Sequence, residues 1–247
     1  PEYCDGQVEQ CPADFYVHDG FPCPADPENF CYDGKCGNRD TQCGTIWGVT
    51  GKNADQTCYD LNTNGNMGGN CGYDHDKNSF FRCLKKDVMC GRLHCEHENE
   101  KHELAVQYSL QQSYTVIRSW DREDIVCRIV YSQYSKAKDP GMVPNGASCG
   151  DDMMCVDAKC KNRIEELKLS PQCKPEHCNG AGICNNMGNC HCKPGFGGVD
   201  CGVPGFGGSV NSGPASERIG AFDVGMFVFW LVFVAFLAFC IASFIVK

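Results

Sequence analysis

The chain has 247 residues, of which 22 are cysteine, and its formal net charge is −9. This cysteine density is typical of a disulfide-bonded chain from an oxidising compartment, so it disfavours a cytosolic enzyme. The acidic balance disfavours nucleic acid as a partner, because phosphate backbones would be repelled. We therefore expect a small disulfide-rich fold, mostly loops with short strands and helices, in which the bridges supply much of the stability.

Fifteen of the cysteines lie in a block at 4–160, whose other residues are rich in Gly, Asn, Asp and Pro and favour turns. The exception is the interval 96–126, which contains no cysteine. It opens on a charged run at 96–103, interpreted as a solvated surface, and continues into β-prone residues. A second strand is predicted at 125–131.

The last six extracellular cysteines lie between 173 and 201. One residue separates Cys190 from Cys192, eight separate Cys192 from Cys201, and a Gly-aromatic pair stands midway. This spacing resembles the C-terminal signature of an EGF-like module. A zinc knuckle is the alternative, but the chain has no C-x-x-C, which argues against zinc. The EGF-like resemblance implies three bridges, Cys173–Cys184, Cys178–Cys190 and Cys192–Cys201, and no calcium ion in this module.

A Gly/Ser/Pro stalk and an apolar segment follow the module. The stalk, at 203–223, is flexible by composition. Residues 224–246 carry no charge, and a helix of 23 residues exceeds the ~30 Å hydrocarbon core. We expect a single transmembrane helix there, in a single-pass type I protein of the cell membrane with its N-terminal side outside. A buried soluble helix is the alternative.

The parity of the cysteines predicts a bridge to sequence before Pro1. Cys240 lies in the expected span, which leaves 21 extracellular cysteines, and an odd number cannot all pair internally. The expected ends of the extra bridge are Cys4, Cys11 or Cys31. Since the chain also opens inside a cysteine framework, we expect it to be a fragment.

Short motifs occur in a fixed order along the chain: PEYCDG at 1–6, DGFPC at 19–23, CYDGKC at 31–36, GNCG at 69–72, CGRLHC at 90–95, DPGMV at 139–143 and MC at 154–155. In this order they resemble the ADAM family, membrane-anchored proteins with metalloproteinase, disintegrin, cysteine-rich and EGF-like domains. The resemblance implies the end of a disintegrin domain at 1–15, a cysteine-rich domain at 16–168, the EGF-like module at 169–202, the stalk at 203–223 and the transmembrane helix at 224–246.

The resemblance also implies two sites. In the family, the variable stretch of the cysteine-rich domain is thought to engage substrates or adhesion partners, and it maps here to about 96–126. The expected exosite residues are Glu96, His97, Glu98, Glu100, His102, Tyr108, Tyr114 and Trp120. The alternative is a solvated loop beside an ordinary strand pair. The family further carries a structural calcium site, and the carboxylates of Glu2 and Asp14 and the carbonyl of Phe15 match part of its ligand set. A further acidic ligand is expected before Pro1, so the chain holds a partial calcium site.

No catalytic residue is expected in the chain. His97 and His102 lie five residues apart, so on a helix the second ring would turn about 140° away from the first, and the H-E-x-x-H zinc motif is not formed. Zinc is therefore expected only in a domain upstream, and whether the parent is a zinc metalloendopeptidase is left open by this sequence.

Two functions are compatible with these features. The first is the non-catalytic ectodomain and membrane anchor of an ADAM-type cell-surface metalloproteinase, giving substrate recognition and cell adhesion. The second is a proteinase-inactive ADAM-type adhesion or signalling receptor. In both, the expected partners are cell-surface proteins, either substrates or adhesion receptors such as integrins.

Overall fold

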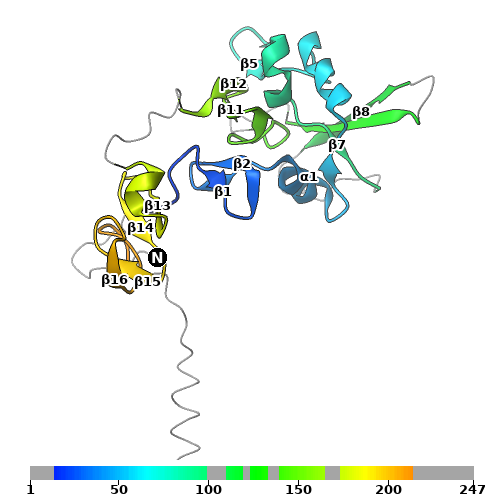
Figure 1. Cartoon of the computed structure of the whole chain (residues 1–247). Coiled ribbons are helices and arrows are strands. Elements are labelled where there is room, and N and C mark those ends of the chain that lie inside the picture. Colours follow the sequence, from blue (N-terminus) through cyan, green and yellow to red (C-terminus); the bar gives the residue numbers. More distant parts are fainter. Residues whose placement is uncertain (1–13, 99–109, 119–122, 133–138, 165–172, 214–247) are drawn as a thin grey trace, which may run out of the picture. The chain divides into compact units, whose positions relative to one another are not determined.

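The computed structural model describes residues 14–98, 110–118, 123–132, 139–164 and 173–213 (Figure 1). The chain divides into two compact units, each described here by itself. The larger comprises 16–174 with 184–188, and the smaller comprises 1–15, 175–183 and 189–247. In the described residues, strands outnumber helices, and one α-helix is formed, so a disulfide-rich fold with short elements is confirmed.

A four-stranded antiparallel sheet organises the larger unit. Its order is β4 (Lys52–Asn53), β7 (Cys95–Glu96), β9 (Ile125–Tyr131) and β8 (Gln111–Ile117). The long strands β8 and β9 pair without interruption from Gln111↔Tyr131 to Ile117↔Ile125. The strand predicted at 125–131 is confirmed, and the β-prone stretch before it contains β8.

Helix α1 (Arg39–Trp47) packs beside this sheet. It begins where the side chain of Asn38 accepts a hydrogen bond from Thr41 N at 2.7 Å, and it ends at Gly48, whose positive φ of 86° suits glycine. Two 3₁₀ helices, η1 (Gln56–Asn64) and η2 (Lys85–Cys90), follow. Short helices of this kind are common connectors.

Small antiparallel sheets complete the larger unit. The first three-stranded sheet has the order β1–β2–β3 and the second the order β10–β11–β12, while β5 and β6 form a hairpin. Their bounds are β1 Pro22–Cys23, β2 Asp26–Tyr32, β3 Lys35–Cys36, β5 Tyr73–Asp74, β6 Ser79–Phe80, β10 Ser148–Gly150, β11 Met153–Val156 and β12 Lys159–Asn162.

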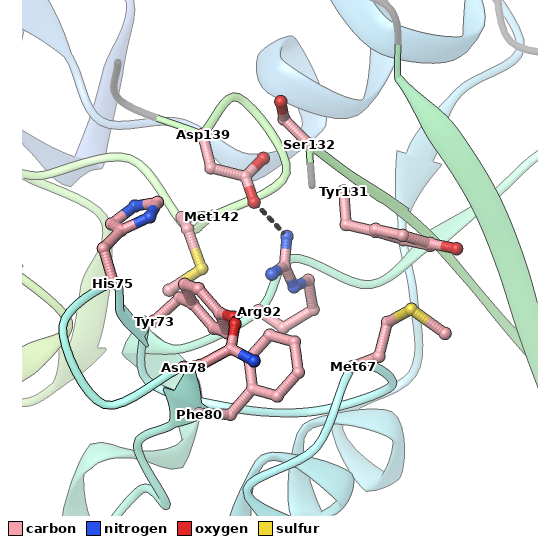
Figure 2. A pocket seen from close by; sticks show the side chains of 11 residues that line it. Met67, Tyr73, His75, Asn78, Phe80, Arg92, Tyr131, Ser132, Asp139 and Met142 are labelled. Atoms are coloured by element: carbon pink, nitrogen blue, oxygen red, sulfur yellow. Dashed lines mark hydrogen bonds and ion pairs between the residues drawn. The ribbon is translucent and has the colours of Figure 1, made fainter. Parts of the chain in front are cut away.

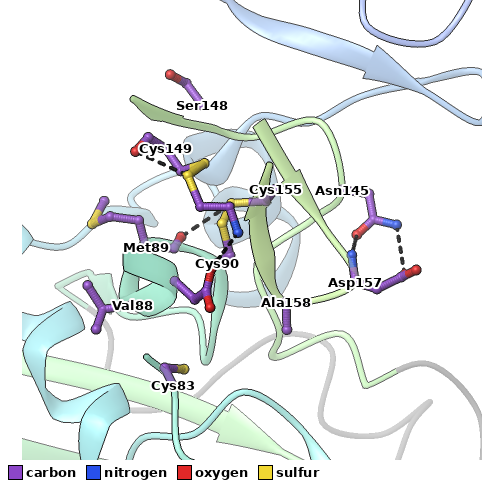
Figure 3. The surroundings of a disulfide bond; sticks show 12 residues. Cys83, Val88, Met89, Cys90, Asn145, Ser148, Cys149, Cys155, Asp157 and Ala158 are labelled. Carbon is purple, nitrogen blue, oxygen red and sulfur yellow. Dashed lines mark hydrogen bonds between the residues drawn. A yellow bond between two sulfur atoms is a disulfide. The ribbon is translucent and has the colours of Figure 1, made fainter. Parts of the chain in front are cut away.

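Disulfides run through the core rather than around it. The main buried cluster places Ile46, Trp47 and Tyr59 among cysteine sulfurs, and the Cys90–Cys155 bridge lies inside it (Figure 3). Within the larger unit the bridges before residue 173 are Cys23–Cys36, Cys43–Cys95, Cys58–Cys127, Cys71–Cys83, Cys90–Cys155 and Cys149–Cys160. The bridges lower the conformational entropy of the unfolded chain and so stabilise the fold where a large apolar core would otherwise be needed.

One described cysteine, Cys31, is free and buried. Burial raises the pKa of its thiol, with a contribution from Asp19. The other two candidate ends of the expected N-terminal bridge, Cys4 and Cys11, lie outside the described residues, so that bridge stays a prediction.

The smaller unit is built on the cysteine cluster at 173–201. Its described elements are η3 (Pro175–Cys178), the pair β13 (Gly182–Cys184) and β14 (Cys190–Cys192), and the pair β15 (Gly195–Gly197) and β16 (Val203–Gly205). The bridges Cys173–Cys184, Cys178–Cys190 and Cys192–Cys201 join the pairs that the EGF-like resemblance implies. Residue Cys184 and the turn after it group with the larger unit, where Val17 forms a β-bridge to Asn185.

The beginning of the predicted stalk is ordered rather than flexible. Residues 203–205 form strand β16, and Gly208 makes a β-bridge with Cys192. The physical reason is that the glycines that suggested flexibility also allow two backbones to approach closely. Among the described residues, the helices are too short and too polar to cross a bilayer, and the segment predicted to do so, 224–246, lies outside those residues.

Candidate functional site

The β8–β9 hairpin presents two faces that differ in what covers them. Because side chains alternate along a strand, Thr115 and Ile117 share one face with Cys127 and Ile125. Part of this face is covered by η1, which is joined to it by the Cys58–Cys127 bridge and the contact of Leu61, while Thr115 is exposed. The bridge and this contact support the hairpin from one side.

The opposite face is covered only at one end. Cys95 lies directly across from Arg128, and its bridge to Cys43 fastens helix α1 there. Beyond the end of α1 at Trp47 the face is open, and Tyr114 is 66% exposed while Val116 is 42% exposed. We call this region the open face. Its hollow has a volume of about 610 Å³ and is lined by Trp47, Gln112, Ser113, Tyr114, Val116, Val126 and Arg128.

Trp47 forms the wall of this hollow next to the helix. Its indole is 2% exposed and stacks on the His97 ring, with the ring centroids 4.1 Å apart and the planes inclined by 21°. His97 is itself only 9% exposed. The interpretation of 96–103 as a solvated run is therefore wrong at His97, because the imidazole gains more from stacking on a buried aromatic ring than from water.

Arg128 supplies the charge of the open face. It is half-buried, and it makes no ion pair with any residue that the structure describes. The chain as a whole has a net charge of −9, so this guanidinium, without an ion-pair partner in the described part of the chain, places a positive charge beside exposed apolar side chains. Arginine presents a planar fork that matches a carboxylate and also stacks on aromatic rings, so the site suits a ligand with an acidic group next to an apolar one.

The predicted exosite residues are partly brought together. Glu96 and Glu98 are exposed, His97 is buried against Trp47, and Tyr114 stands on the open face. The other four, Glu100, His102, Tyr108 and Trp120, lie outside the described residues. Sequence reasoning missed Trp47 and Arg128, and it included Val116 only as part of the predicted stretch 96–126. Alternation along 111–117 could have indicated which side chains share a face with Tyr114, whereas nothing local indicates Trp47.

A second hollow of about 480 Å³ lies in the same unit, between the β5–β6 hairpin and the end of β9 (Figure 2). Arg92 stands in its middle, 2% exposed, with Nη1 2.6 Å from Asp139 Oδ2 and 3.0 Å from the Val130 carbonyl. Its walls are aromatic and sulfur-containing side chains, among them Tyr73, Phe80 and Met142. Because its two charges neutralise each other, this hollow favours an uncharged apolar ligand and gives less charge selectivity than the open face.

The expected calcium ligands have little described structure. Asp14 is exposed and Phe15 is half-buried, while Glu2 lies outside the described residues. Carboxylate and carbonyl oxygens are the donors that calcium prefers, so the chemistry of this set fits the ion. One side-chain ligand of the set, Asp14, has a described position.

Comparison with known proteins agrees with the disulfide architecture. The family model described as ADAM cysteine-rich matches residues 19–141. The chain is 44% identical to disintegrin and metalloproteinase domain-containing protein adm-2 of Caenorhabditis elegans, over 87% of this chain and 23% of that protein. It is 35% identical to disintegrin and metalloproteinase domain-containing protein 33 of Homo sapiens, over 88% of this chain and 26% of that protein. It is 32% identical to disintegrin and metalloproteinase domain-containing protein 9 of Homo sapiens, over 99% of this chain and 29% of that protein.

These matches show that the chain belongs to the ADAM family. It spans about a quarter of the length of the curated relatives it matches. The β8–β9 hairpin and helix α1 both lie within the matched cysteine-rich segment, so the open face is a feature of that segment.

Proposed function

We propose that this chain is the non-catalytic, membrane-proximal part of an ADAM-type cell-surface protein, and that its open face binds a partner protein at the cell surface. The observation that carries the proposal is Arg128, which has no ion-pair partner among the described residues, beside the exposed Tyr114 and the Trp47 wall. Arg, Tyr and Trp are the residues most enriched where interfaces gain their binding energy. The support of the hairpin by η1 keeps the ordering cost of binding low.

The chemistry of the face favours a partner segment that carries a carboxylate beside an apolar side chain. The apolar group enters the hollow between Tyr114 and Trp47, and the guanidinium of Arg128 donates hydrogen bonds to the carboxylate. The backbone of strand β8 is accessible to a partner segment, since β8 is an edge strand of its sheet. Its sequence, QQSYTVI, also carries no charge that would oppose pairing with another strand. In the parent protein such a surface would guide a peptidase to cell-surface substrates, or mediate adhesion directly if the proteinase domain is inactive.

Reversing the charge of Arg128 tests the proposal. We expect Arg128→Glu to weaken attachment of cells to the immobilised chain about tenfold, because a carboxylate would then meet a like charge. The matched control is Arg82→Glu, which makes the same change of net charge at an exposed arginine that lines neither hollow. Equal weakening by both variants would assign the effect to overall charge and contradict the open face as the binding site.

We further propose that residues 224–246 anchor the chain as a single transmembrane helix, with the cysteine-containing part outside the cell. The support is the run of 23 uncharged residues, which is long enough to cross the hydrocarbon core. The EGF-like nature of 169–202 belongs to the same proposal, and the pairing of its six cysteines supports it.

A structural calcium ion held by Glu2, Asp14 and the Phe15 carbonyl is the last part of the proposal. Titration of the full chain with calcium should show saturable binding, and Asp14→Asn should lower the affinity at least tenfold because one anionic ligand is lost. Asp200→Asn, at an exposed aspartate elsewhere in the smaller unit, is the control. If the two variants bind calcium like the unaltered chain, the ion is not held at Asp14.

A further inference from the structure

The β15–β16 hairpin pairs the two copies of the sequence PGFGG, which stand at 194–198 and 204–208. The register sets Gly195 opposite Gly205, Phe196 opposite Pro204 and Gly197 opposite Val203. The two backbones approach so closely that a Cβ added to Gly205 would lie 2.8 Å from the Cα of Gly197. This close approach leaves no room for a side chain at Gly205, and the side chains of the neighbouring residues project to the two faces of the hairpin.

Five exposed apolar side chains surround this hairpin, with Phe196 beside Pro204 on one face and Val203 beside Gly197 on the other. Phe206 is 90% exposed, and the other members are Val199 at 77%, Val210 at 68%, Val203 at 53% and Phe196 at 43%. We call these five residues the Phe206 patch. All five fall within residues 196–210, whereas the exposed apolar side chains elsewhere in the described chain are more widely spaced along the sequence. The Cys192–Cys201 bridge holds the hairpin without them, which leaves them available for an external surface.

The position of the patch in the chain indicates which surface it meets. Thirteen residues separate Val210 from Val224, where the proposed membrane span begins. A linker of that length reaches at most about 45 Å when extended and about 20 Å on average when flexible. The patch is therefore tethered close to the bilayer, so the effective concentration of lipid around it is high.

The chemistry of the patch agrees with a lipid interface. Phenylalanine and valine insert at the boundary between headgroups and acyl chains. The hairpin and its flanks carry one cation, Lys193, and one anion, Asp200, so they have little net charge. Binding would therefore depend on apolar burial and vary little with salt or with anionic lipid.

We propose that the β15–β16 hairpin docks on the outer leaflet through the Phe206 patch and holds the membrane-proximal end of the ectodomain against the lipid. This inference rests on the proposed span at 224–246. It assigns a lipid-binding function to the repeated PGFGG sequence and to the exposed side chains that the fold itself does not use.

Fluorine NMR on the full chain in phosphatidylcholine nanodiscs tests the proposal. 4-Fluorophenylalanine is placed singly at Phe206, at Phe81 as an exposed control in the larger unit, or at Phe229 within the proposed span. We expect lipid carrying a doxyl group on its acyl chain to broaden the signals at 206 and 229 at least twofold and to leave 81 unchanged. A water-soluble gadolinium chelate should broaden 81 more than 206.

The three probes separate the possible failures. If doxyl lipid broadens the signal at position 229 but leaves the signal at position 206 as sharp as the one at position 81, the docking is overturned and the span is kept. Shielding of 206 from both agents would assign the patch to a protein surface, such as a second copy of the chain, and would also overturn docking. Failure of lipid to broaden 229 would overturn the span and the docking together.

A paired substitution gives an independent readout. With the probe at Phe196, the double change Phe206→Ser and Val203→Ser should abolish the lipid broadening, whereas Phe81→Ser should not. Retention of the Cys192–Cys201 bridge, checked by mass spectrometry, shows that the hairpin has kept its fold. Undiminished broadening in the double variant would contradict the patch as the lipid contact.

Discussion

Replacing both Cys90 and Cys155 by alanine should lower the free energy of unfolding of the larger unit by about 4 kcal/mol. The bridge closes a loop with a sequence separation of 65, and the entropy lost by the unfolded chain grows with loop length. Both cysteines are also fully buried in the main core cluster, so no water replaces the lost contact. Urea unfolding followed by tryptophan fluorescence measures the change.

The Cys149–Cys160 bridge provides the matched control. It lies beside Cys90–Cys155 but has a sequence separation of only 11, so the same relation gives about 3 kcal/mol for its removal (Figure 3). The long-loop variant should therefore unfold at a lower urea concentration than the short-loop variant. The reverse order would contradict loop closure as the main source of stability in this fold.

Acidification from pH 7 to pH 5 should destabilise the larger unit by about 2 kcal/mol through His94 alone. His94 is fully buried against Tyr59, and neither ring nitrogen has a hydrogen-bond partner among the described residues. Burial, helped by the nearby Arg92, lowers its pKa to about 3, from an ordinary value of 6.5. Between those two values the unfolded chain binds the extra proton, so stability is complete above pH 6.5 and is lost as the pH falls.

Substitution of His94 by leucine should remove this pH dependence, since leucine does not titrate. His75→Leu is the control, because His75 is exposed. The free energy of unfolding of each variant is measured at pH 7 and at pH 5. A difference between the two pH values that is as large in His94→Leu as in the unaltered chain would show that other groups control the acid response.

The sequence predicts local features of this fold better than distant ones. The strand at 125–131 follows from a continuous run of β-prone residues, and the disulfide-rich architecture follows from cysteine density alone. The role of Trp47 could not be predicted, because about fifty residues separate it from His97 and the Cys43–Cys95 bridge brings them together. Arg128 was overlooked for a similar reason, since its isolation depends on which elements surround it.

In the candidate site, too, the sequence predicts some residues correctly and fails where exposure depends on distant parts of the chain. Tyr114 was predicted from a family resemblance and stands on the open face. His97 was assigned to the same surface from the same resemblance, and its charged neighbours indicated a solvated run, yet its ring is buried. Charge patterns indicate the average exposure of a run, whereas the exposure of one side chain depends on the partner that the fold provides.

The central claim is that the open face of the β8–β9 hairpin contacts a partner at the cell surface. Photo-crosslinking from that face tests it most directly, with benzoylphenylalanine in place of Tyr114 and, as the control, in place of Phe81, which is 49% exposed and lines neither hollow. On living cells, illumination should give a discrete adduct with one membrane protein from position 114 and none from position 81. Arg128→Glu should abolish the adduct. Equal adducts from both positions, or none from position 114 while cells still attach to the chain, would contradict the claim.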